Sequence, residues 1–230
     1  MKKVFIISCM LLLAYITFGQ QIRSRDVDID DIMNLLRASG YELFSFDITE
    51  MLNARYNLHF IKKEFEAGEK IGSSNLTVTP NKRLLTDFPG TTLQDILDAG
   101  RSIIDPETQA IAHAEKFNIG FYPSSNDSIK MMQISVPDFV TSRRPLRLRG
   151  LTIEDSDRPF YRYRVIPFRI EAFEANTFIP LILVGSAWID ERFNMIRFCS
   201  EREFSPDMSN ESLQNIPHYF VIGVRFDRQN

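Results

Sequence analysis

The sequence predicts an α+β protein, with a mostly antiparallel β-sheet in its C-terminal half and about three helices in its N-terminal half. Two observations carry this prediction. Before about Phe117, apolar residues recur at helical spacing in several segments; after it, they alternate with polar residues as in half-buried strands. The composition agrees, because 44% of the 230 residues are hydrophobic and 25% are charged, which is typical of a folded globular chain.

Each expected helix begins at a residue that suits its N-terminus. Asp28 precedes four apolar residues between Ile29 and Leu36 that recur at i, i+3, i+4 and i+7, and this stripe is expected to pack on a sheet. Thr92, with an aspartate three residues later, matches a variant of the capping box before the second helix. Asp105, followed by a proline, suits the start of a third helix.

Alternating apolar and polar residues predict the strands. Tyr41 to Ile48 and Tyr56 to Phe60 are close together along the chain, so they are predicted to form a hairpin. The run from Phe178 to Ile189 is almost continuously apolar, which favours a central strand that is covered on both faces. Further strands are expected at 76–79, 117–121, 132–136, 146–152, 161–173, 195–200 and 218–225.

Residues 1–19 have the layout of a secretory signal peptide. Two lysines precede an apolar stretch that ends at Phe18, and cleavage is predicted between Gly19 and Gln20. The stretch is shorter than the roughly twenty residues of a membrane-spanning helix, so no transmembrane segment is expected in the mature chain. A retained membrane anchor and a lipoprotein acylated at Cys9 are the alternatives.

We therefore expect export through the Sec pathway to the periplasm, the cell surface or the medium. Residues 20–230 are predicted to form a single α+β domain. The change in pattern at residue 117 leaves open a helix-rich subdomain, 20–116, and a strand-rich subdomain, 117–230. Removal of the signal peptide leaves Cys199 as the one cysteine, which excludes an internal disulfide, and its strand-like surroundings predict burial.

The order of these features resembles a family of secreted proteins of unknown function from Bacteroidetes bacteria. The resemblance rests on a short signal that ends in Phe18-Gly-Gln-Gln21 and on the disulfide-free α+β chain after it. It implies export and a bacterial lineage, and it leaves the activity open.

Charge and motif content exclude several classes of function. The chain has 27 Lys and Arg against 30 Asp and Glu, a net charge of −3, so it lacks the basic excess typical of proteins that bind nucleic acid. It contains no phosphate-binding glycine loop and no Gly-x-Ser-x-Gly motif, and its three histidines lack metal-binding spacing. The sequence thus predicts no cofactor and no metal site. His59 lies on the polar side of its strand and is expected to be solvated or hydrogen-bonded.

The arginines are the candidate ligand-binding residues, because eight of them occur between residues 143 and 169. Arg147 and Arg149 share one face of a predicted strand, and Arg162 and Arg164 share one face of another. If these strands are neighbours, four guanidinium groups lie on one surface, which suits carboxylate, sulfate or phosphate groups. An anionic ligand or a glycan is therefore the candidate partner; the alternative is a solvated outer face on which the arginines pair with acids.

Two hypotheses of different classes remain for the function. The first is a non-enzymatic domain that binds a ligand or partner through one face of the sheet. The second is an exported hydrolase whose site is assembled from dispersed Asp, Glu and His residues. A cleft with two convergent acids or a His–acid pair would favour the enzyme, and a broad aromatic and arginine face without such a cleft would favour the binder. The missing motifs favour the binder.

Overall fold

The computed structural model describes residues 28–78, 80–152, 159–170 and 173–229. The chain divides into two compact units at Ala38 and Ser39. In the first, helix α2 (Ile29–Ala38) begins as predicted, because the backbone N–H of Asp31 donates to Oδ1 of Asp28 at 2.9 Å. No residue of α2 is buried within this unit, and the packing of its apolar stripe on a sheet stays a prediction. The predicted signal peptide lies outside the described residues.

Four strands of the second unit form one antiparallel sheet, which we call sheet A. Their order in space is β1-β6-β7-β8. The strands are β1 (Glu42–Asp47), β6 (Lys116–Pro123), β7 (Ile129–Val136) and β8 (Val140–Arg147). In β6 and in most of β7, buried residues alternate with less buried ones, as the sequence predicts for strands with one face on the core.

Five strands form a second antiparallel sheet, sheet B, in the order β3-β2-β13-β10-β9. The strands are β2 (Tyr56–Glu66), β3 (Glu69–Val78), β9 (Tyr163–Pro167), β10 (Ile179–Ser186) and β13 (His218–Arg228). Every residue of β10 after the first is buried. The prediction of a strand covered on both faces is therefore confirmed for this segment.

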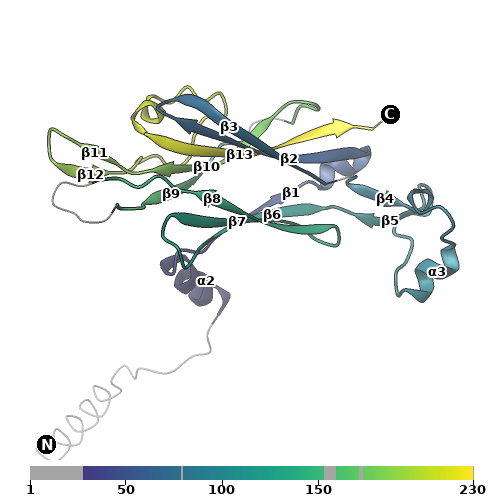
Figure 1. The fold of residues 1–230 in the computed structure, drawn as a ribbon. Coiled ribbons are helices and arrows are strands. Elements are labelled where there is room, and N and C mark those ends of the chain that lie inside the picture. The colour runs from purple at the N-terminus through teal and green to yellow at the C-terminus, as the bar shows by residue number, and fades with distance from the viewer. Residues whose placement is uncertain (1–27, 79, 153–158, 171–172, 230) are drawn as a thin grey trace, which may run out of the picture. The chain divides into compact units, whose positions relative to one another are not determined.

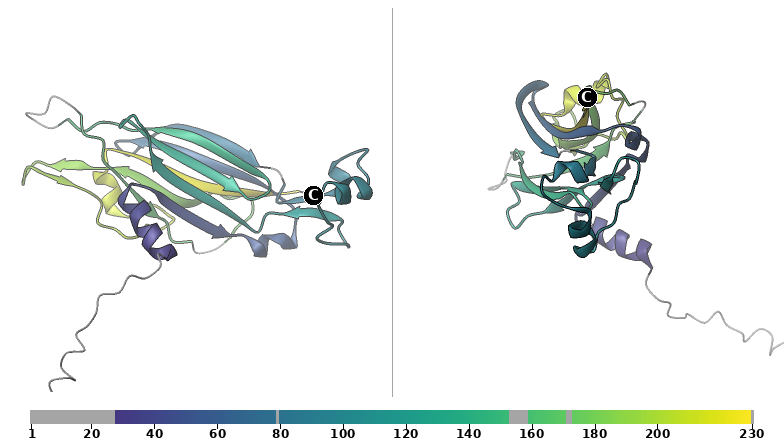
Figure 2. Two further views of the ribbon diagram at one scale, coloured as in Figure 1. Left: turned by 90° about the horizontal axis from the view of Figure 1, so that it is seen from below. Right: turned by 90° about the vertical axis from the view of Figure 1, so that its right-hand side faces the viewer.

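The two sheets pack face to face as a β-sandwich (Figures 1 and 2). Side chains from both inner faces form one apolar core, in which Phe60 and Ile222 of sheet B lie with Phe117 and Met132 of sheet A. The rings of Phe60 and Phe117 meet edge to face with their centroids 5.0 Å apart, a favoured aromatic geometry. The hydrophobic effect of this burial holds the sheets together.

A second apolar cluster covers the outer face of sheet B. The segment after Arg197 folds back and packs Phe204 and Ile216 against Leu183 and Val221 of the sheet. Cys199 belongs to this cluster and is buried, as the sequence predicts. This cover explains why β10 is buried on both sides.

Short elements complete the second unit. Two small antiparallel pairs form, one between β4 (Lys82–Leu84) and β5 (Ala110–His113) and one between β11 (Trp188–Asp190) and β12 (Met195–Arg197). Helix α3 begins at Thr92, whose side chain forms the predicted capping box with Asp95. Further elements are α3 (Leu93–Asp98) and the 3₁₀ turns η1 (Thr49–Asn53), η2 (Leu85–Asp87) and η3 (Glu211–Asn215).

The predicted hairpin between the first two strands is wrong. β1 pairs with β6 in sheet A, whereas β2 pairs with β3 and β13 in sheet B. The link between β1 and β2 crosses from one sheet to the other, and the buried Asn81 holds it. Its amide oxygen accepts from the N–H of Tyr56 at 2.8 Å, and its amide nitrogen donates to the carbonyl of Met51 at 3.0 Å. Strands from before residue 117 thus pair with strands from after it.

The predicted third helix is also not formed. The carboxylate of Asp105 accepts from the N–H groups of Glu107 and Thr108, as in a helix cap, but Gln109 has φ of +54° and the chain turns back. The N–H of Ala110 then bonds to the carbonyl of Asp105 at 3.1 Å, and β5 begins. The α-helices of the described residues are α2 and α3, so the protein is β-rich and mostly antiparallel.

Candidate functional site

The inner face of sheet B changes from apolar to polar at one end. There Glu66 of β2 lies opposite His218 of β13, and Ser186 of β10 lies opposite Tyr163 of β9. The register between β10 and β13 places Ser186 beside His218, and the N–H of His218 donates to Oγ of Ser186 at 3.2 Å. Paired residues point to the same face of a sheet, so four strands contribute to one line of polar side chains, which we call the polar row.

A chain of hydrogen bonds connects Tyr163 and His218 of the polar row to Glu64 of β2. Oη of Tyr163 lies 2.6 Å from Nδ1 of His218, whose Nε2 lies 3.2 Å from Oε1 of Glu64. The backbone N–H of Arg149 donates to Oη of Tyr163 at 2.8 Å. Because a carboxylate only accepts, we assign the imidazole proton to Nε2, which donates to Glu64, while Nδ1 accepts from the phenol of Tyr163.

Burial sets the protonation states in this chain. His218 is 1% exposed, and its removal from water lowers the pKa of the imidazole, although the hydrogen bond and the charge of Glu64 act in the opposite direction. Burial raises the pKa of Tyr163 to about 12, against the hydrogen bond from the N–H of Arg149. At neutral pH the imidazole is therefore neutral and the phenol protonated, as the hydrogen bonds require.

This arrangement holds Tyr163 in place without activating it. A general base needs a nitrogen within reach of the substrate, whereas both ring nitrogens of His218 are engaged and the residue is almost entirely buried. A phenol with a pKa of about 12 is a weak nucleophile at neutral pH. His218, held by Glu64, is therefore a rigid support for Tyr163.

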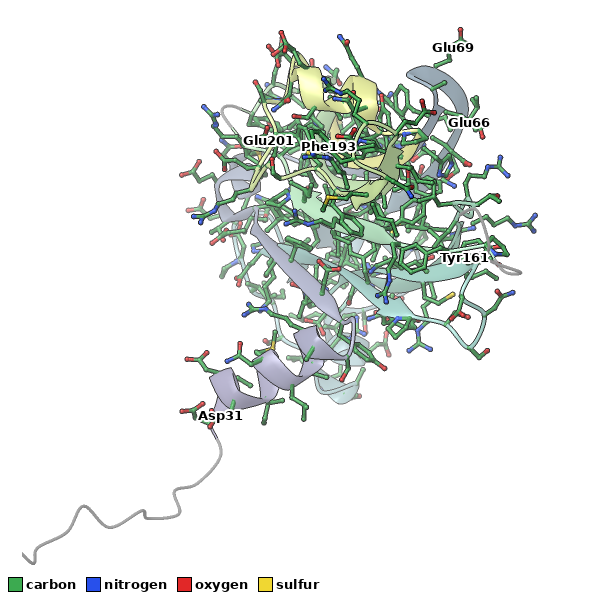
Figure 3. All side chains as sticks on the ribbon, turned by 90° about the vertical axis from the view of Figure 1, so that its left-hand side faces the viewer. Asp31, Glu66, Glu69, Tyr161, Phe193 and Glu201 are labelled. Carbon is green, nitrogen blue, oxygen red and sulfur yellow. The ribbon has the colours of Figure 1, made fainter. Side chains whose placement is uncertain are left out.

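Tyr163 also lines an open cleft of about 480 Å³, which we call the cleft. Its walls come from Glu42 at the start of β1, from Ser124, Asp127 and Lys130 around the turn between β6 and β7, and from residues 159–163. Tyr161, labelled in Figure 3, belongs to the last of these segments. The volume lies within the range of small-molecule sites.

Opposite charges are balanced in the cleft. Nζ of Lys130 lies 3.2 Å from Oε1 of Glu42, and their side chains are 14% and 30% exposed. The guanidinium of Arg162 lies 5.2 Å from the centre of the Phe160 ring, a cation–π contact. With Asp127, the cleft contains two cationic and two anionic side chains. Its formal charge is therefore close to zero, while its capacity to donate and accept hydrogen bonds is high.

The four arginines predicted as ligand-binding residues lie in different places. Arg147 ends β8 in sheet A, and Arg164 of β9 in sheet B donates to the carbonyl of Cys199. Arg149 lies just beyond β8, with Nε 3.6 Å from Oε1 of Glu66, and Arg162 lines the cleft. β8 and β9 are not neighbours, so the arginines do not form the expected shared surface. Their binding of an anion stays a prediction.

A second histidine–acid pair lies on the outer face of sheet B. Nε2 of His59 is 3.1 Å from Oδ2 of Asp227, and its Nδ1 is 3.0 Å from Oγ1 of Thr77, so the expected hydrogen-bonded histidine is confirmed. Arg225 binds both carboxylate oxygens of Asp227, at 2.7 and 2.8 Å. None of His59, Asp227 and Thr77 lines the cleft, and we interpret this network as a surface ion pair.

Potential metal ligands and the thiol offer no further site. Among the residues that the structure describes, no three His, Cys, Asp or Glu side chains are grouped so that they could hold a metal ion. Burial raises the pKa of the Cys199 thiol, which keeps it protonated at neutral pH.

Sequence reasoning missed most of the site. It singled out Arg162, but not Glu64, Tyr161 or Tyr163. A signal was present, because Glu64 follows Leu58 at an even spacing and therefore shares the inner face of β2. A charged residue in phase with a buried stripe indicates a polar partner on the neighbouring strand. Only the folded structure shows that this partner is His218, which lies diagonally from Glu64 across the pair of β2 and β13.

Comparison with known proteins places the whole described fold in one family. The model of a domain of unknown function, DUF5041, matches residues 11–228. The chain belongs to the DUF5041 family. No curated protein and no solved structure gives a significant match. The DUF5041 match therefore covers both sheets and the cleft, and it assigns no activity to them.

Proposed function

We propose that this DUF5041 protein binds a small polar ligand in the cleft and does no chemistry on it. The observation that carries the proposal is the combination of an open cleft lined by aromatic rings and paired charges with a rigid support beneath Tyr163. Ligand sites typically combine apolar surface with a few well-held polar groups. Pre-arranged side chains lose little conformational freedom on binding, which favours affinity.

We also propose that the protein acts outside the cytoplasm, after cleavage between Gly19 and Gln20. The charged start, the short apolar stretch and the small residue before the cleavage point support this proposal. In the part of the chain that the structure describes, no helix is long and apolar enough to cross a membrane. Mass spectrometry of the protein from its native host should find a chain that begins at Gln20 or close to it; an intact Met1 in the membrane fraction would contradict export with cleavage.

Ligand-induced stabilisation tests the binding proposal. Saccharides, amino acids, dicarboxylates and nucleosides are screened by the shift in the thermal midpoint, since saturation at 100 times Kd adds about 2.7 kcal/mol to the free energy of unfolding. Arg162→Ala should weaken the response to the ligand that is found. Arg147→Ala removes the same charge from the end of β8, outside the cleft, and should leave the response unchanged.

Two outcomes would contradict the binding proposal. One is that no compound class stabilises the wild type at millimolar concentration. The other is that Arg147→Ala weakens the response as much as Arg162→Ala, because the ligand would then act through general charge.

A hydrolase is the second candidate, and the observation that favours it is the pair of Glu64 and His218 at hydrogen-bond distance. In that case ligand entry would have to displace Tyr163 from Nδ1 of His218 to free a base. Turnover of a chromogenic ester, phosphate or glycoside by the wild type, with loss in His218→Gln at unchanged folding, would favour the enzyme. If the wild type binds a ligand but turns over none of these substrates, the hydrolase hypothesis fails and the binding function remains.

A further inference from the structure

The paired charges of Lys130 and Glu42, which line the cleft, have the spacing of the hydroxyls in a diol. Nζ of Lys130 donates hydrogen bonds, Oε1 of Glu42 accepts them, and the two atoms are 3.2 Å apart. Oxygens of neighbouring hydroxyls on a sugar ring are separated by a similar, hydrogen-bond-like distance. One hydroxyl can accept from Lys130 while its neighbour donates to Glu42, so a diol matches the pair without disturbing its charge balance.

A held aromatic ring lines the same cleft. Tyr161 packs so closely on Gly150 that a Cβ at that position would lie 3.2 Å from its ring and 2.5 Å from Cβ of Pro159. Leu151 and Phe160 bond to each other through both backbone groups, at 2.8 and 2.9 Å, which fixes the backbone next to Tyr161. Tyr161 is half-buried, so part of its ring remains open to a ligand.

The rest of the lining disfavours a strongly charged ligand. Two cations and two carboxylates leave no excess of positive charge for a polyanion, and Ser124 adds a hydroxyl that both donates and accepts. An apolar ring face beside mixed donors and acceptors matches a molecule that has hydroxyl groups around its edge and C–H groups on its faces. Amphipathic tyrosine rings suit such surfaces.

We propose that the ligand of the cleft is a saccharide unit, with neighbouring hydroxyls bound by Lys130 and Glu42 and one C–H face of its ring packed on Tyr161. This inference rests on the proposed function, and it names the class of ligand. It makes Tyr161 and Glu42 the residues that determine specificity.

Titration calorimetry with neutral and acidic oligosaccharides tests the inference on the full-length mature protein. Tyr161→Ala should weaken binding at least tenfold, and Glu42→Gln several-fold, because the amide offers a weaker acceptor while it keeps the shape. Phe193→Ala removes an aromatic residue that is 59% exposed and lies outside the cleft, and it should change affinity less than twofold. A deoxy sugar that lacks one of the two hydroxyls should lose the same factor as Glu42→Gln.

Folding of each variant is checked by its thermal midpoint, and Tyr161→Phe serves as a second variant that keeps the ring and should keep the affinity. If an amino acid or dicarboxylate binds, and Tyr161→Ala abolishes that binding while no saccharide binds, the cleft remains a ligand site and the saccharide inference is overturned. If no compound of any class binds, the proposed function and the inference both fail.

Discussion

Tyr163→Phe is the substitution that isolates the support beneath the cleft, because it removes one hydroxyl and keeps the ring. The hydroxyl has two partners, Nδ1 of His218 and the backbone N–H of Arg149. Arg149 is exposed, so its amide can bond to water after the change. His218 is 1% exposed, so its Nδ1 loses a partner that water cannot readily replace.

The expected loss follows from this difference. An unsatisfied buried acceptor costs about 1–3 kcal/mol, and the exposed amide adds little, so Tyr163→Phe should reduce the free energy of unfolding by about 2 kcal/mol. For a chain of this length, that corresponds to a decrease of roughly 4–8 °C in the thermal midpoint. Urea unfolding should show a lower midpoint with an unchanged m-value, since the surface exposed on unfolding is the same.

Tyr122→Phe is the matched control. Tyr122 lies on β6 and stacks on Tyr41, with ring centroids 6.1 Å apart, a contact that does not need its hydroxyl. This variant should change stability by less than about 0.5 kcal/mol. If Tyr163→Phe is as stable as the wild type, or no less stable than Tyr122→Phe, the hydrogen bond to His218 does not support the cleft and the reasoning is refuted.

Three further predictions concern pH, packing and the thiol. Burial lowers the pKa of His218 below the value of about 6.5 that it has in an unfolded chain, so the free energy of unfolding should fall as the pH decreases from 6.5 towards that lowered pKa. In His218→Gln this fall should be less steep. If urea titrations find the same dependence of the free energy of unfolding on pH in both proteins, the prediction is contradicted. Gly223→Ala places a Cβ 2.2 Å from the carbonyl oxygen of Ile179 and should reduce the free energy of unfolding by about 1–3 kcal/mol. Gly72→Ala places a Cβ 3.7 Å from the nearest atoms, those of Glu64, and should leave the free energy of unfolding nearly unchanged in the same assay. Cys199 should react slowly with a thiol reagent in the folded protein and rapidly in denaturant; equal rates would show an exposed thiol.

The sequence predicted local elements well where periodicity and caps act within a few residues. The alternation around Phe46 and Phe60 identified β1 and β2, and the Thr92 cap identified α3. The partners of these strands lie far along the chain, since Phe46 pairs with Phe117 and Phe60 with Val224. Proximity in sequence suggested a hairpin, but burial of two inner faces against each other requires that the chain cross between sheets.

The third helix failed for a different reason. Asp105 has the chemistry of a helix cap, and the same side-chain bonds also stabilise a tight turn. The residues after the cap decide which of the two forms, and here Ala110 and Ile111 are buried against other elements as part of a strand. Tertiary packing therefore decides between outcomes that local sequence allows equally.

The candidate site was less predictable than the fold. Its supporting residues, Glu64, Tyr163 and His218, come from three strands, and His218 lies 154 residues from Glu64 in sequence. The predicted cluster of arginines required β8 and β9 to be neighbours, and the division into two sheets separates them. Only Arg162 of the four lines the cleft, and the rest of the cleft lining comes from other strands and from the turns between them, which the arginine pattern did not indicate.

Chemical-shift mapping of the backbone amides with a bound saccharide tests most directly the claim that the cleft is the ligand site. Perturbations that saturate with ligand should be largest at residues 40–42, 123–130 and 159–163, the segments that line the cleft. The outer face of sheet B around His59 and Arg225 should show no comparable change. The largest perturbations at that outer face, with the cleft segments unaffected, would contradict the account.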